Sequence, residues 1–91
     1  MLISDVAAEI VRTKTAHAIR RRRTEPEEGQ PIEYDAQPFN ETGNKKGWIL
    51  LDAFTASIMC QVYENISPKA QESFNKITLY KLIDICWKAI K

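Results

Sequence analysis

The residue types that most often do chemistry are few in this sequence and lie far apart. His17 is the only histidine, and the cysteines are Cys60 and Cys86. A metal or acid–base role for His17 would need partners one helical turn away, where Thr13 and Arg21 stand instead. We therefore expect a surface or interfacial histidine, no metal site, and two reduced cysteines that pack as small apolar residues.

Motifs for nucleophilic catalysis and phosphate binding are also missing from the sequence. Ser57 and Ser73 have no catalytic motif around them, and Ser67 precedes Pro68 in a typical helix start. The stretch 43–47 (GNKKG) lacks the strand, the spacing and the final Ser or Thr of a phosphate-binding loop. We expect no catalytic residue, no cofactor and no enzyme activity.

Basic side chains are the strongest chemical signal in the first half of the chain. On the end of a helix, consecutive arginines would form a collar able to contact phosphates. Against this, Glu25, Glu27 and Glu28 follow the arginines at once, and the net charge is only +1. Nucleic-acid binding is therefore the alternative function. Its candidate contacts are Arg12, Lys14, Arg20, Arg21, Arg22 and Arg23.

The apolar pattern predicts an all-α fold, a small helical bundle in one domain of 91 residues. We expect an N-terminal helix over 4–23, capped by Ser4 and ending in the arginines. An irregular arm follows over 24–47, where prolines and glycines disfavour helix. Three helices over 48–91 would form the core.

Within the arm, residues 31–35 alternate in polarity and could form a short extended segment. Tyr34 and Phe39 are among its few large apolar residues. We expect them to anchor the arm on a helical surface, either that of the chain itself or that of a partner. Together with the arginines, they form the predicted contact surface for a partner protein or nucleic acid.

The C-terminal half carries more apolar surface than a chain of this length can easily cover. A helix over 48–66 is apolar around most of its circumference, with Phe54 on its main apolar face. The last helix, over 79–90, has a second apolar face besides its core face. Because Trp and Tyr are enriched at interface centres, we predict a homodimer or larger oligomer. The predicted self-association residues are Trp48, Tyr63, Tyr80 and Trp87.

One segment resembles a known set of proteins. The stretch Leu51–Ser57 (LDAFTAS), followed by Val62 and Tyr63 and by the later Phe74, is similar to small uncharacterised proteins of phages, prophages and other mobile elements. The resemblance covers roughly the last 45 residues. It implies an accessory protein that binds and modulates or inhibits a host protein, for example a defence nuclease in the manner of an anti-CRISPR.

The first residues do not have the pattern of an export signal, since Asp5, Glu9, Arg12 and Lys14 interrupt the apolar positions. The chain also lacks an uncharged apolar stretch long enough for a membrane span. We therefore expect a protein of the host-cell cytoplasm that does not associate with membranes.

Overall fold

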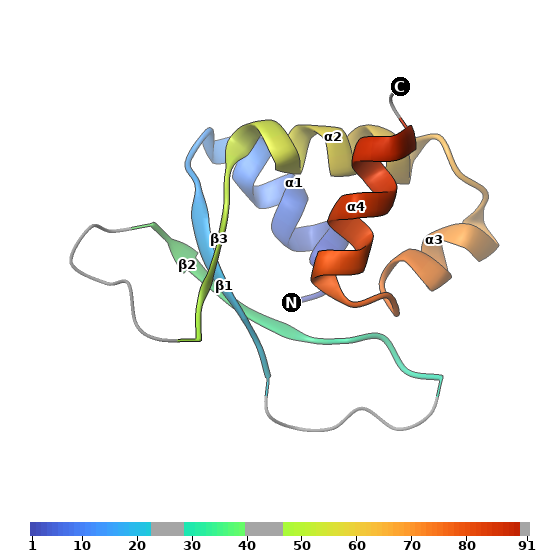
Figure 1. The fold of residues 1–91 in the computed structure, drawn as a ribbon, viewed down its shortest axis with the longest axis horizontal. Helices are drawn as coiled ribbons and strands as arrows, with labels where there is room; N and C mark the ends of the chain where they lie inside the picture. Colours follow the sequence, from blue (N-terminus) through green and yellow to red (C-terminus); the bar gives the residue numbers. More distant parts are fainter. Residues whose placement is uncertain (23–28, 40–46, 90–91) are drawn as a thin grey trace.

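The computed structural model describes residues 1–22, 29–39 and 47–89. Within these residues the chain forms four helices and a three-stranded antiparallel sheet (Figure 1). In chain order the elements are α1 (Ile3–Thr13), β1 (His17–Arg21), β2 (Tyr34–Pro38), β3 (Ile49–Leu51), α2 (Ala53–Glu64), α3 (Pro68–Phe74) and α4 (Leu79–Ala89). The all-α prediction is therefore wrong, and the fold is mixed α/β.

The predicted N-terminal helix over 4–23 is divided into a helix and a strand. It ends as α1 at Thr13, whose Oγ1 donates to the Glu9 carbonyl at 2.9 Å. Lys14 then takes a left-handed backbone conformation, with φ 55°, which breaks the helical hydrogen-bond ladder. The following residues form β1, the central strand, which pairs with β2 on one side and β3 on the other. Two pairings outweigh the weak helical pattern of this segment.

Both other strands come from regions predicted as arm or helix. The expected extended segment at 31–35 overlaps the start of β2, which aligns Ala36 with Ile19 of β1. The helix predicted over 48–66 begins only at Ala53, because the residues before Asp52 form β3 and pair with β1. Asp52 separates strand from helix, since its Oδ1 accepts a hydrogen bond from the Thr55 amide at 2.7 Å.

The last two helices begin where the sequence predicts. Ser67 caps α3 by accepting a hydrogen bond from the Ala70 amide at 3.2 Å, and Pro68 is the first helical residue. The final helix, α4, begins at Leu79 as expected. None of the helices in the described ranges is long and apolar enough to cross a bilayer.

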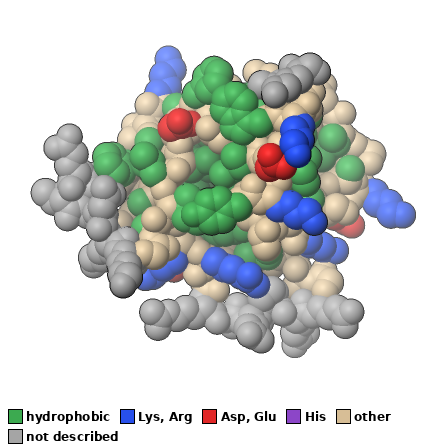
Figure 2. Space-filling view, viewed as in Figure 1, with side chains coloured by type: hydrophobic (Ala, Val, Ile, Leu, Met, Phe, Trp, Pro, Cys, Tyr) green, Lys and Arg blue, Asp and Glu red, His purple; other side chains and the backbone are tan. Residues whose placement is uncertain are grey.

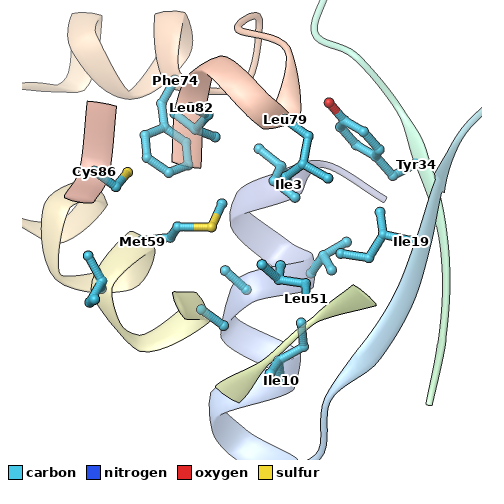
Figure 3. Close-up of a cluster of buried hydrophobic side chains, with 14 of the residues drawn as sticks. Ile3, Ile10, Ile19, Tyr34, Leu51, Met59, Phe74, Leu79, Leu82 and Cys86 are labelled. Carbon is cyan, nitrogen blue, oxygen red and sulfur yellow. The ribbon is translucent and has the colours of Figure 1, made fainter. Parts of the chain in front are cut away.

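The core lies between the helices and one face of the sheet (Figure 3). In Figure 3 the labelled side chains of α1, α2, α3 and α4 and those of Ile19, Tyr34 and Leu51 from the strands point into one shared interior. The largest fully buried side chains are those of Ile3, Ile10, Ile19, Leu51, Met59, Leu82, Val6 and Cys86. The sheet therefore has one buried face and one outer face.

Asn75 joins three segments that are distant in sequence. Its side chain is buried, and its Oδ1 accepts a hydrogen bond from the Ser4 amide at 3.1 Å. Its carbonyl accepts another from the Ile32 amide at 2.9 Å. Ser4 is therefore not the cap that the sequence predicts: Leu2 occupies the cap position without a side-chain bond, and Asn75 satisfies a first-turn amide of α1 instead.

Candidate interaction surface

Exposed apolar side chains gather where α4 meets the start of α2. We call Phe54, Tyr80, Ile83 and Trp87 the aromatic surface. Phe54 is 66% exposed and Tyr80 is 71% exposed, while Ile83 and Trp87 are half-buried. The rings of Phe54 and Trp87 lie 5.5 Å apart between centroids, at an interplanar angle of 46°. Figure 2 shows hydrophobic side chains gathered over this part of the molecule, bordered by charged ones.

The two faces of α4 explain why this surface exists. Leu79, Leu82 and Cys86 form the buried face, which packs toward α2 and the core. The spacing of Tyr80, Ile83 and Trp87 places them on the neighbouring face of the same helix. Within the described residues, Phe54 is the aromatic side chain that packs against this second face, and it leaves much of that face in contact with solvent.

Of the four predicted self-association residues, the structure places Tyr80 and Trp87 on this surface. Tyr63 lies elsewhere: it is half-buried, and its ring meets that of Phe74 edge-on at 5.1 Å between centroids. Trp48 precedes β3 and is half-buried beside the sheet. Phe54 was missed, because its place on the apolar face of a continuous helix over 48–66 predicted a core residue.

A row of charged residues runs beside the aromatic surface on α4. Each residue of the charged row comes directly after one residue of the apolar row: Lys81 after Tyr80, Asp84 after Ile83 and Lys88 after Trp87. The charged row is therefore parallel to the apolar one. Lys88 Nζ lies 3.0 Å from Asp84 Oδ2, with both side chains largely exposed. The row carries both signs of charge directly at the border of the apolar residues.

The outer face of the sheet carries the arginines in a different setting. Asp35 of β2 is opposite Arg20 of β1, and the Arg20 Nη2 atom lies 3.3 Å from Asp35 Oδ2. Arg22 reaches Asp35 Oδ1 at 3.0 Å and Glu33 Oε2 at 2.8 Å. A hydrogen bond from Arg22, and to a smaller extent one from Arg20, holds the pKa of the Asp35 carboxyl below its usual range. We call these four residues and Trp48 the arginine surface.

Arg20 also covers Trp48. Its guanidinium carbon lies 4.5 Å from the centroid of the Trp48 ring, a cation–π arrangement. The Trp48 Nε1 atom is buried and has no hydrogen-bond partner among the residues that the structure describes. Arg20 stacks on an indole and pairs with a carboxylate, so it has less charge to offer a phosphate. Arg22 is also paired with carboxylates, so both of these predicted phosphate contacts already have partners within the chain.

The other predicted contact residues are dispersed. Arg12 pairs with Glu9 on α1, and Lys14 is the left-handed residue that ends this helix. Arg21 points to the opposite side of β1 from its neighbours and lines a small hollow together with Tyr34 and Tyr80. The structure therefore does not join these residues and the arginine surface into one basic collar. Arg23 lies outside the described residues.

The predicted anchor residues of the arm differ from expectation in one case. Tyr34 is 3% exposed and belongs to the core, where burial raises the pKa of its hydroxyl. It is therefore no contact for a partner. Phe39 is half-buried, and its amide donates to the Ala16 carbonyl at 2.8 Å. Both anchor the arm, but they anchor it on the chain's own strand and core.

The histidine and the two cysteines, the residue types that most often do chemistry, are buried or half-buried. His17 is buried in β1, contrary to the expected surface position, and its Nδ1 lies 2.8 Å from the Thr15 carbonyl oxygen. Both cysteines are free thiols, and burial raises the pKa of Cys60 and of Cys86. Across residues 1–22, 29–39 and 47–89, no three His, Cys, Asp or Glu side chains are grouped so that they could hold a metal ion.

Comparison of the chain with protein-family models, with curated proteins and with solved structures finds no match. The fold and its surfaces define a small α/β protein with a three-stranded antiparallel sheet. Its function has to be argued from those surfaces.

Proposed function

We propose that the chain is a non-enzymatic protein-binding module whose working part is the aromatic surface. The observation that carries this proposal is the exposure of Phe54 and Tyr80 next to the half-buried ring of Trp87. Residue types such as Tyr and Trp, placed together and open to solvent, are those that dominate the binding energy of protein interfaces. A contiguous apolar patch bordered by charges is typical of a surface that a partner covers.

The resemblance of the C-terminal half to small phage and mobile-element proteins supplies the biological setting of the proposal. In that setting the chain acts in the host cytoplasm, binds a host protein and modulates or inhibits it. A defence nuclease is the concrete target, in the manner of an anti-CRISPR. This choice of target rests on the resemblance, whereas the aromatic surface supports protein binding in general.

Nucleic-acid binding is the less favoured function. Arg20 and Arg22 pair with Asp35 and Glu33, so the acidic residues oppose a phosphate at the same place where the arginines would bind it. A phosphate-binding surface works by exposing cations that release counterions on binding. The arginine surface contains as many carboxylates as guanidinium groups, and this arrangement favours a structural role.

The test is capture of partners from host lysate by the tagged chain, with nuclease and high salt present, read by mass spectrometry. Tyr80→Lys should abolish capture of a stoichiometric host protein, since it places a charge in the apolar row of α4. Val11→Lys is the matched control, because Val11 is an exposed apolar residue on α1, outside the aromatic surface. Equal capture by the wild type and Tyr80→Lys would overturn the proposal.

A further inference from the structure

We propose that a second copy of this chain covers the aromatic surface, with α4 of one copy packed antiparallel to α4 of the other in a two-fold symmetric dimer. This inference rests on one part of the proposed function, that the aromatic surface binds a protein, and it names a second copy of the chain in place of a host protein as the partner that covers this surface. It is carried by the order of charges beside the apolar residues and by the symmetry that a pair of identical chains must obey.

The surface of α4 consists of two parallel rows. The apolar row contains Tyr80, Ile83 and Trp87, and the adjacent row contains Lys81, Asp84 and Lys88. Residues three and four apart on a helix share a face, so each row follows the helix axis. In an antiparallel two-fold pair, the same edge of the two helices comes together, and the charged row of one copy therefore lies along the charged row of the other.

The charged row is complementary to itself when it is reversed and shifted by one helical turn. Without the shift, lysine would face lysine and Asp84 would face Asp84. With it, Asp84 of each copy faces Lys81 or Lys88 of the other, and both pairs form at once because of the symmetry. The apolar rows then meet beside these pairs, which fix the register. Asp84 between two lysines also disfavours a phosphate ligand for the same surface.

The exposed area is of the size that the centre of a small dimer interface needs. Aromatic side chains have about 150–250 Å² of surface each. At 66% and 71% exposure, Phe54 and Tyr80 together offer about 300 Å² per copy. Symmetry doubles this area to about 600 Å², a substantial apolar share of the roughly 1,200–2,000 Å² that a stable interface buries in total. Ile83 and Trp87 extend the same patch.

The experiment uses two charge variants of the full chain, measured by sedimentation equilibrium. Asp84→Lys gives a row of three lysines, and the double variant Lys81→Glu/Lys88→Glu gives a row of three acids. We expect the wild type to be a dimer and each variant alone to dimerise at least tenfold more weakly, because like charges meet along the helix. The two variants mixed should form a heterodimer in any register, which also shows that both are folded.

Lys69→Glu on α3 is the control: it makes one Lys-to-Glu change, the same type as each half of the double variant, at an exposed lysine away from α4, and it should leave the dimer unchanged. A monomeric wild type, or a mixture that forms no heterodimer, would overturn the inference. If the wild type is monomeric while Tyr80→Lys still abolishes capture of a host protein, the inference fails and the proposed function stands. A wild-type dimer that loses no host partner with Tyr80→Lys supports the inference and removes the host-binding role of this surface.

Discussion

The arginine surface and the aromatic surface differ in how many of their side chains have interaction partners within the same chain. On the sheet, Arg20 and Arg22 have carboxylate partners on the neighbouring strand, and Arg20 also stacks on Trp48. On the helices, the Phe54 and Trp87 rings meet each other, but Tyr80 and most of Phe54 stay in water. A conspicuous run of charges in a sequence can therefore be paired within the folded chain and need no external ligand. Within the described residues, Phe54 and Tyr80 of the C-terminal half have no comparable cover from the chain itself.

The largest expected effect comes from truncating one residue on each face of α4 and comparing the two losses of stability. Leu82 is 1% exposed, so Leu82→Ala should lower the free energy of unfolding by about 3 kcal/mol, through lost burial and the cavity left behind. Tyr80→Ala should change it by less than about 0.5 kcal/mol at dilutions where the chain is monomeric. Urea unfolding followed by circular dichroism measures both. A loss of similar size in the two variants would mean that Tyr80 belongs to the core.

A smaller effect is expected at Asn75, whose side chain links the segment after α3 to the first turn of α1. Asn75→Ala removes the hydrogen bond to the Ser4 amide and leaves this first-turn donor unsatisfied, at a cost of about 1–2 kcal/mol. The control is Asn65→Ala, where an exposed side chain donates to the Gln61 carbonyl within one helix end. Its expected cost is below about 0.5 kcal/mol by the same urea titration. Equal costs would contradict the bridging role of Asn75.

The C-terminal helices could be predicted because their signals are local. Ser67 and Pro68 mark a helix start within two residues, and the apolar positions of α4 repeat at helical spacing. The sequence could also place Tyr80 and Trp87 off the core face of α4 for the same reason, because the helical phase that it predicts for this segment is correct. Local patterns were sufficient wherever the partner of a residue is one helical turn away.

The sheet could not be predicted, because its signals are not local. Ile19 pairs with Ala36 and with Ile49, and neither partner is near it in sequence. The short strand β1 carries no alternation strong enough to distinguish it from the end of a helix. A related error concerns Phe54: Leu51 lies in a strand and α2 begins at Ala53, so Leu51 and Phe54 do not share the helix face that the sequence pattern assigned to both.

Removing the carboxylates should turn the arginine surface into a weak anion-binding surface. In Glu33→Gln/Asp35→Asn, Arg20 and Arg22 lose their partners, so affinity for a DNA duplex at low salt should rise several-fold, with a steeper salt dependence. Fluorescence anisotropy with a labelled duplex measures both. Asp84→Asn, which neutralises a carboxylate on α4, is the control. Duplex binding by the wild type as tight as by the double variant would restore nucleic-acid binding as the leading function.

The smallest expected effect is the pH dependence that the arginine surface adds to stability. The pKa of Asp35 is lowered in the folded chain by hydrogen bonds from Arg22 and Arg20, so the folded state favours the ionised carboxylate. Its contribution to stability is therefore fully present above the ordinary pKa of an aspartate, near 4, and is lost as pH falls through the lowered pKa. The urea midpoint of the wild type should exceed that of Asp35→Asn slightly at neutral pH, and the two should converge in acid. Because both side chains of the ion pair are partly exposed, added salt should reduce the difference at neutral pH. A difference that grows toward low pH would show that Asp35 is destabilising as an anion, and the arginine surface would then no longer be a satisfied contact.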